Sequence, residues 1–338
     1  MLTDVKTELS PEWMSWVAHN TLVGGDPVRM ATILVENGFD EVTARAAIDD
    51  ARNHPYVTAG KKLANQVAKR DWLLHTTRMM RESGDQLIDE VWDSIPLAEF
   101  HRDYYRQNRP LIIRNGMKWA ARQRWTPEYL RETMGSRTVE VQANRESDPD
   151  YEVNCRDHKR AMLFSEFMDI VYSDVETNDF YMTANNSGVN ADALNGLWED
   201  LNPLPEMLDS ATKDERMFFW MGPKGTVTPI HHDLTNNLMA QVSGRKRIKL
   251  IAPEYLPFVY NHRHCYSPVD LENIDYERFP LFRFVKVIDI TIGPGDLFFL
   301  PVGWWHHVRG LDTTITITCT NFREVNHFVD HYKTFGMI

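Results

Sequence analysis

Residues 228–233 read Thr-Pro-Ile-His-His-Asp, and the His-x-Asp pair within them decides how the chain is interpreted. Alternate residues of a β-strand point to the same side, so His231 and Asp233 can grip one metal ion while His232 faces away. Another histidine, His306, follows much later, directly after two tryptophans. Two imidazoles and one carboxylate suit a non-haem iron(II) site that leaves coordination positions open. The sequence therefore predicts an iron site made by His231, Asp233 and His306.

A lysine that differs from its basic neighbours follows this pair. Strand alternation puts Lys246 on the same face as apolar residues, and it puts Arg245, Arg247 and Lys249 on the opposite face. All four are candidates to anchor an anionic co-substrate, but a lysine on an apolar face needs a charged partner. Lys246 is thus the favoured anchor for a dicarboxylate, which its ammonium would bind as a compact point charge.

Short β-like runs separated by turn residues make up the chain from about Ile95 onward. Residues 237–242 and 246–251 flank the turn Ser-Gly-Arg, which predicts that they pair as a hairpin. A Gly-Pro-Gly-Asp turn at 293–296 introduces the strand that leads to His306. Many short strands with few helices between them predict a sandwich or jelly-roll barrel. The other candidate strands are residues 110–114, 138–141, 180–183, 217–220, 285–291, 296–300 and 313–320, with helices at 126–134 and 164–172.

The chain before this region is predicted to be helical, from residue 10 to about residue 83. A capping side chain followed by proline occurs at residues 10–11 and 26–27, an arrangement typical of helix starts. A longer helix is expected over residues 61–82. It carries many Lys and Arg, for which a solvated face is favoured over a partner surface.

The composition is that of an ordinary globular protein, with 43% hydrophobic and 25% charged residues among 338. The net charge of -11 gives no attraction to phosphates, so a nucleic acid partner is not expected. The three cysteines form no CxxC pair, which predicts reduced thiols and a cytoplasmic location. No apolar run approaches the roughly 18 residues of a membrane span, and no leader pattern is present, so membrane association is not expected.

Several blocks occur in an order and spacing typical of a known family: residues 228–233, 237–246, 275–280, 293–296 and 304–307. They resemble the JmjC, or cupin-like, oxygenases that depend on iron(II) and 2-oxoglutarate. Within this family, the sequence blocks are most similar to those of the branch containing the asparaginyl hydroxylase of the hypoxia-inducible factor. The resemblance implies a mainly β fold with added helices, in which residues 86–338 form a double-stranded β-helix, or jelly roll. Residues 1–85 fall outside it and are predicted to be a helical accessory segment for dimerisation or substrate recruitment.

The resemblance also implies roles for individual residues. His231, Asp233 and His306 match the family's iron ligands. Lys246 matches the lysine that pairs with the distal carboxylate of 2-oxoglutarate. Iron(II) is thus the implied cofactor, with 2-oxoglutarate and O2 as co-substrates. The positions that match the polar lining of the co-substrate pocket are Thr228, Asn237, Tyr181 and Asn321.

The chain departs from the asparaginyl hydroxylase at positions which that enzyme uses on its peptide. Cys265 and Tyr266 stand in place of an Arg-Gln pair, and Arg323 stands in place of a tryptophan. These three residues are therefore candidate substrate-binding residues for a different substrate. The chain also leaves little room for that enzyme's dimerising helices, so that mode of dimerisation is not expected, while a homodimer remains a candidate assembly.

These features predict a dioxygenase that hydroxylates a carbon of an amino acid residue in a protein or peptide. One alternative is a tailoring oxygenase that acts on a free or carrier-bound amino acid. Another is an N-methyl-lysine demethylase, which ranks lower because the chain lacks zinc-binding or chromatin-reading Cys/His clusters. A non-catalytic cupin used for binding ranks last, because it would need neither the full ligand set nor Lys246.

Overall fold

The chain divides into two units, Met1–Gly84 and Asp85–Ile338. The structure is a computed structural model that describes residues 5–84, 88–183, 189–212 and 216–332. Within the described residues, no helix combines the length and the apolar character needed to cross a membrane.

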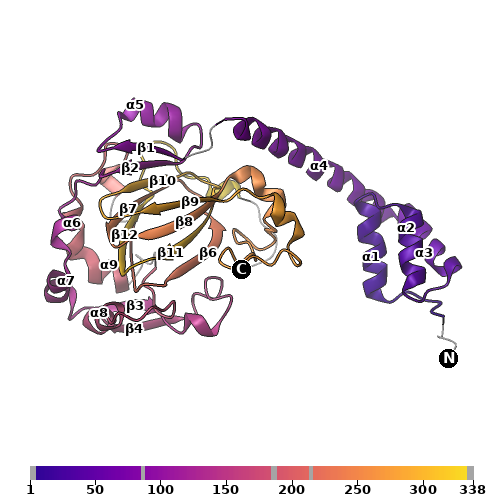
Figure 1. Cartoon of the computed structure of the whole chain (residues 1–338), viewed down its shortest axis with the longest axis horizontal. Coiled ribbons are helices and arrows are strands. Elements are labelled where there is room, and N and C mark those ends of the chain that lie inside the picture. Colours follow the sequence, from indigo (N-terminus) through magenta and orange to yellow (C-terminus); the bar gives the residue numbers. More distant parts are fainter. Residues whose placement is uncertain (1–4, 85–87, 184–188, 213–215, 333–338) are drawn as a thin grey trace. The chain divides into compact units, whose positions relative to one another are not determined.

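The N-terminal unit consists of helices joined by short turns (Figure 1). Three of them begin with proline in the first turn, where the missing N–H removes no helical hydrogen bond. The side chains of Asp26 and Asp40 cap two helices by accepting hydrogen bonds from first-turn N–H groups. The last helix begins at Pro55 rather than at Lys61 as expected, because proline is compatible with its first turn. The helices are α1 (Pro11–Leu22), α2 (Pro27–Glu36), α3 (Glu41–Asn53) and α4 (Pro55–Glu82).

The second unit is built on a six-stranded and a four-stranded sheet (Figure 1), with strand orders β1-β2-β10-β7-β12-β5 and β6-β11-β8-β9. The predicted jelly-roll core is confirmed. Short helices surround it: α5 (Leu97–Glu99), α6 (Ala121–Arg124), α7 (Pro127–Met134), α8 (Phe164–Val171) and α9 (Val189–Leu194). The strands of the larger sheet are β1 (Asp89–Trp92), β2 (Leu111–Arg114), β5 (Met217–Gly222), β7 (Asn237–Ser243), β10 (Leu297–Leu300) and β12 (Thr314–Cys319). Those of the smaller sheet are β6 (Val227–His232), β8 (Lys246–Ile251), β9 (Ile288–Ile292) and β11 (Trp305–Gly310), and β3 (Thr138–Gln142) pairs separately with β4 (Lys159–Leu163).

The central strands of the larger sheet are buried on both faces. Adjacent residues of its strands belong to different hydrophobic clusters: Ile113 and Phe299 to one, Ile112 and Phe298 to the other. Because successive side chains point to opposite faces, each face has its own apolar cluster. Such two-sided burial explains why these strands are almost continuously hydrophobic in sequence.

The hairpin predicted around Ser243 is wrong. β7 pairs with β10 and β12, whereas β8 pairs with β11 and β9 in the other sheet. Both edges of β7 are therefore occupied, and the turn carries the chain from one sheet to the other. Gly244 makes this crossing possible at φ +68°, since a Cβ there would lie 2.1 Å from the carbonyl oxygen of Thr313.

Two other strand predictions also differ from the structure. Residues 180–183 form no strand, and only single bridges join Tyr181 to Gln142 and Met182 to Met221. The strand expected over 285–291 begins at Ile288. Both segments lie where a short apolar run meets an irregular loop, and the sequence pattern does not mark that boundary.

Candidate metal centre

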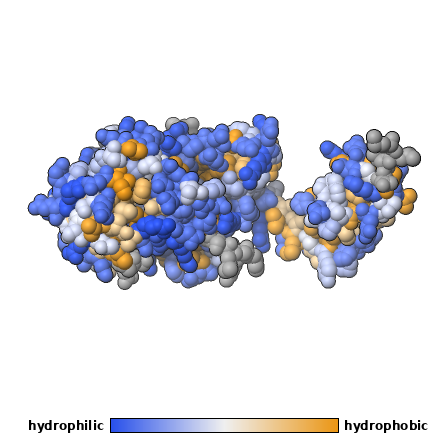
Figure 2. All heavy atoms as spheres, turned by 90° about the horizontal axis from the view of Figure 1, so that it is seen from below, coloured by the Kyte–Doolittle hydropathy of each residue, from blue (hydrophilic) through white to orange (hydrophobic). Residues whose placement is uncertain are grey.

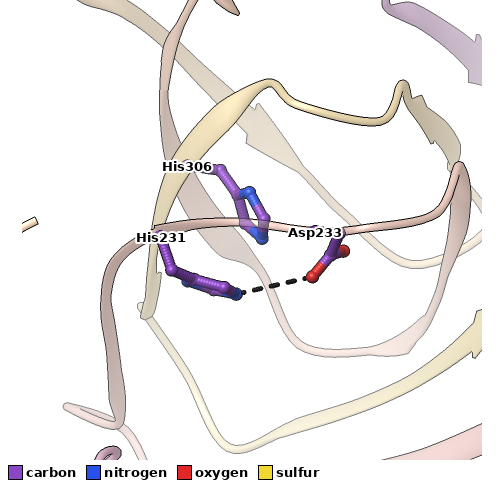
Figure 3. A group of neighbouring side chains, drawn as sticks. All are labelled: His231, Asp233 and His306. Carbon is purple, nitrogen blue, oxygen red and sulfur yellow. Dashed lines mark ion pairs between the residues drawn. The ribbon is translucent and has the colours of Figure 1, made fainter. Parts of the chain in front are cut away.

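Two neighbouring strands of the smaller sheet position the three predicted ligands. β6 and β11 are antiparallel, and His231 lies directly opposite His306 in their register. Asp233 follows the last residue of β6. Strand pairing thus brings a histidine that is distant in sequence beside the His-x-Asp pair, and the three side chains point toward one another (Figure 3).

The distances among the three side chains suit one metal ion. Nε2 of His231 lies 3.7 Å from Oδ1 of Asp233, and the ring centroids of His231 and His306 are 4.1 Å apart. The potential ligand atoms of all three residues lie within 4.8 Å of one another. Metal–ligand bonds are about 2 Å long at zinc sites, so one ion can reach all three side chains after small side-chain movements. Among the described residues, this is the group of His, Cys, Asp and Glu with metal-binding geometry.

Backbone and side-chain contacts orient each ligand. Nδ1 of His231 donates to the carbonyl of Pro229 at 2.9 Å, and Nδ1 of His306 donates to that of Trp304 at 3.1 Å. A carbonyl can only accept, so Nδ1 carries the proton and Nε2 keeps its lone pair for a metal. Nδ2 of Asn237 donates to Oδ2 of Asp233 at 3.3 Å, which leaves Oδ1 on the side of His231.

Burial keeps one of these imidazoles neutral. It lowers the pKa of His306 to about 3, and the neighbouring His231 lowers it further. The neutral form is the one that coordinates a metal, so the ring does not have to lose a proton to bind near neutral pH.

The same three residues line a cavity of about 70 Å³ between the two sheets. Of the polar residues expected around the co-substrate, Tyr181, Thr228, Asn237 and Lys246 line it. Asn321 is not part of this lining, and its Nδ2 instead donates to the carbonyl of Asp209 at 2.7 Å. Sequence reasoning did not single out four further lining residues, although alternation along their strands could have indicated them: Trp220, Met239, Val308 and Thr318.

Lys246 is buried inside this cavity, with 2% of its surface exposed. Its Nζ donates to the hydroxyl of Tyr181 at 3.1 Å, and among the described residues no carboxylate forms an ion pair with it. Burial without an anion lowers its pKa to about 7. The other basic residues of this segment each pair with an acidic side chain on the opposite face: Arg245 with Asp312, Arg247 with Asp289 and Lys249 with Glu272. A buried ammonium without an anion fits the distal carboxylate of 2-oxoglutarate.

A larger cleft of about 1010 Å³ lies beside the metal centre. Tyr266 lines it, and its ring centroid is 6.0 Å from that of His231. Cys265 contributes its carbonyl, which accepts from the backbone N–H of His232, and burial raises the pKa of its thiol to about 11. Arg323 lies elsewhere, with Nε donating to the carbonyl of Leu208. Of the three candidate substrate residues, the structure thus brings only the Tyr266 side chain to the cleft wall.

Residues 96–327 match the family model described as a cupin-like domain. The chain belongs to this family. It is similar to lysine-specific demethylase JMJ30 of Arabidopsis thaliana, with 31% identity over 68% of this chain and 53% of the relative. It is also similar to lysine-specific demethylase 8 of Xenopus tropicalis, with 29% identity over 66% of this chain and 50% of the relative. A third relative, tRNA wybutosine-synthesizing protein 5 of Gallus gallus, is 25% identical over 64% of this chain and 71% of its own.

The cupin-like family match and the His231–Asp233–His306 geometry fit the expected iron(II) cofactor, with 2-oxoglutarate and O2 as co-substrates. The donor set and the buried Lys246 fit these groups. The chain spans about half the length of the two demethylases. The finer resemblance to the asparaginyl hydroxylase branch stays a prediction.

Proposed function

We propose that this cupin-like protein is a dioxygenase that hydroxylates a carbon of an amino acid residue in a protein or peptide. The observation that carries the proposal is a single cavity lined both by the three potential iron ligands and by Lys246, a buried cation without an acidic partner among the described residues. A binding module has no need for both features, whereas an oxygenase that uses 2-oxoglutarate needs each of them.

Each residue of the cavity has a defined task in this proposal. Nε2 of His231, Nε2 of His306 and Oδ1 of Asp233 would hold the iron. Lys246 and the Tyr181 hydroxyl would hold the distal carboxylate of 2-oxoglutarate. When bound, these groups supply an oxidation in which one oxygen atom of O2 enters a C–H bond and the other enters succinate, with release of CO2.

The protein side of this chemistry is electrostatic and positional. An arriving carboxylate would raise the pKa of Lys246 again and keep its ammonium protonated, because opposite charges stabilise each other in a buried cavity. Burial raises the pKa of Tyr181 above its ordinary value, so the phenol keeps its proton and remains a hydrogen-bond donor.

A mass-spectrometric experiment tests the proposal. The purified protein would be incubated with iron(II), 2-oxoglutarate, O2 and a peptide library, and Asp233→Ala would serve as the control. We expect succinate formation and peptides that gain one oxygen atom only with the wild-type protein. Turnover at the same rate by both proteins would reject it.

A second candidate is N-methyl-lysine demethylation, which the names of two relatives favour. Hydroxylation of an N-methyl carbon gives an unstable product that releases formaldehyde, so the same cavity serves both reactions. Methylated lysine peptides separate the two: demethylation removes a methyl group and yields formaldehyde, whereas carbon hydroxylation leaves an added oxygen atom and yields none.

We further propose that residues 1–85 form an accessory unit for dimerisation or substrate recruitment. Hydrophobic side chains are visible on the surface of this unit (Figure 2). The exposed large hydrophobic residues of α4 include Leu63, Trp72 and Met80, which are 64%, 67% and 65% exposed. Exposed apolar groups of this size favour contact with a partner. A cytoplasmic location is part of the same proposal.

A further inference from the structure

Arg145 contacts residues that line both the metal cavity and the larger cleft, although neither described lining includes it. It begins the short 3-10 helix Arg145–Ser147, which follows β3. Its side chain is 0% exposed. Nη2 donates to Oε1 of Glu152 at 2.6 Å and to the carbonyl of Val227 at 2.8 Å.

On one side, Arg145 supports the residue that meets Lys246. The Cζ atom of Arg145 lies 5.0 Å from the ring centroid of Tyr181. The ammonium of Lys246 lies 5.6 Å from the same ring and donates to its hydroxyl. A cation over a tyrosine ring attracts it, and more strongly where water is excluded. The place of the Tyr181 hydroxyl therefore depends on Arg145.

On the other side, Arg145 supports the wall of the cleft. Its Cζ lies 4.4 Å from the ring centroid of Tyr151, and the Tyr151 hydroxyl donates to the same Val227 carbonyl that Arg145 contacts. Tyr151 and Glu152 both line the cleft. Val227 precedes Thr228, which lines the metal cavity, so one guanidinium ties the two walls together.

The incomplete hydrogen bonding of the Arg145 guanidinium indicates that its charge and planar shape are needed at this position. Nε and Nη1 are buried and have no hydrogen-bond partner among the described residues. Burying such a group is costly unless something compensates, and the two tyrosine rings supply that attraction. An apolar side chain could fill the space without this cost, but it could not pair with Glu152 and hold both rings.

We propose that Arg145 is a positioning residue that fixes Tyr181 against Lys246 for 2-oxoglutarate and fixes Tyr151 and Glu152 at the cleft. This inference rests on the proposed function. Arg145 touches neither the iron ligands nor the reacting carbon in this account. It acts through the residues that it holds.

The test measures 2-oxoglutarate binding by calorimetry to the full-length protein loaded with Mn(II) under anaerobic conditions, so that no turnover is needed. We expect Arg145→Met to weaken this binding by about tenfold, through the lost support of Tyr181. Affinity for Mn(II) should stay unchanged, because the metal ligands are untouched. Arg145→Lys should lose less, since an ammonium keeps the charge but cannot reproduce the planar fork.

Arg114→Met is the matched structural control. Arg114 is also largely buried and pairs with Glu90 and Asp296, both at 2.6 Å, and these residues line neither cavity. The control should lower the melting temperature while leaving the Kd for 2-oxoglutarate unchanged. Unaltered 2-oxoglutarate affinity in folded Arg145→Met would overturn the inference.

If Arg145→Met does not fold, a double-mutant cycle tests whether Arg145 acts on 2-oxoglutarate binding through Tyr181. Arg145→Lys should weaken 2-oxoglutarate binding in the wild-type background but have little effect in Tyr181→Phe, where the supported hydroxyl is gone. Losses that simply add would overturn the role of Arg145 and leave the proposed function intact. A wild-type protein that bound Mn(II) but no 2-oxoglutarate would instead refute the proposed function, and this inference with it.

Discussion

The ammonium of Lys246 lies 3.1 Å from the hydroxyl of Tyr181, in a cavity that is also lined by His231, Asp233 and His306. The lysine comes from β8 and the tyrosine from a loop before β5, so the fold and not local sequence makes this contact. The lysine ammonium and the tyrosine hydroxyl can both donate hydrogen bonds to one carboxylate. Because three metal-binding side chains line the same cavity, this arrangement favours an anionic ligand bound beside a metal ion. The predictions below test the parts of this arrangement separately.

Loss of a histidine ligand should abolish metal binding. His231→Ala and His306→Ala each remove one of three ligands, and we expect iron(II) affinity to fall by orders of magnitude, as measured by metal analysis after dialysis. His262→Ala is the matched control, since His262 is exposed and lies outside the ligand group. Full iron occupancy in both ligand variants would reject the site.

Asn237 should affect the metal through Asp233. Its Nδ2 donates to Oδ2 of that carboxylate, and loss of such an outer contact typically costs about 10- to 100-fold in metal affinity. We therefore expect Asn237→Ala to weaken iron(II) binding within that range in a competition titration with a chelator. If its metal affinity matched that of the wild type, Asn237 would serve the co-substrate alone.

The sequence predicted this site better than the strand pairing around it. Strand alternation identified His231 with Asp233, and it also identified Lys246 as the cation on the apolar face. Alternation depends only on local geometry, so it survives without knowledge of the fold.

Alternation could not predict which strands pair with β7 and which pair with β8. These pairings depend on which strand edges are already occupied by segments distant in sequence. Trp220 and Thr318 lie on β5 and β12, where alternation indicates which residues share a face but not which face lines the cavity. Arg145 begins a short 3-10 helix after β3, and its full burial is a consequence of tertiary packing. Exposure of an arginine is the ordinary expectation from sequence.

Removal of the N-terminal unit should spare the iron site. No residue before 85 belongs to the described ligand group or to the lining of either cavity. We expect residues 86–338 to retain iron(II) and 2-oxoglutarate affinity within about threefold, a change of less than 1 kcal/mol. Activity on a protein substrate, or the dimer fraction in sedimentation, should fall. A truncated protein that folds but no longer binds iron would contradict the division of roles.

Binding of 2-oxoglutarate should weaken as the pH rises above about 7. Burial lowers the pKa of Lys246 to about 7 in the absence of an anion, while a bound carboxylate favours the ammonium. Below pH 7 the lysine is already charged, so affinity is constant. Above pH 7 binding must take up a proton, so affinity falls by up to about tenfold per pH unit. Calorimetry with Mn(II)-loaded protein from pH 6 to pH 9 measures this slope, and Lys246→Arg should flatten it.

The most direct measurement is the 2-oxoglutarate affinity of Lys246→Ala in metal-loaded, anaerobic protein. Truncating one partner of a buried ion pair costs about 2–5 kcal/mol, and each factor of ten corresponds to about 1.4 kcal/mol. We therefore predict a loss of at least about thirtyfold in 2-oxoglutarate affinity with iron(II) still bound, and partial recovery in Lys246→Arg. Lys249→Ala, whose side chain pairs with Glu272 on the opposite face, should bind as the wild type does. Unchanged 2-oxoglutarate affinity in Lys246→Ala would contradict the account even if the iron site were intact.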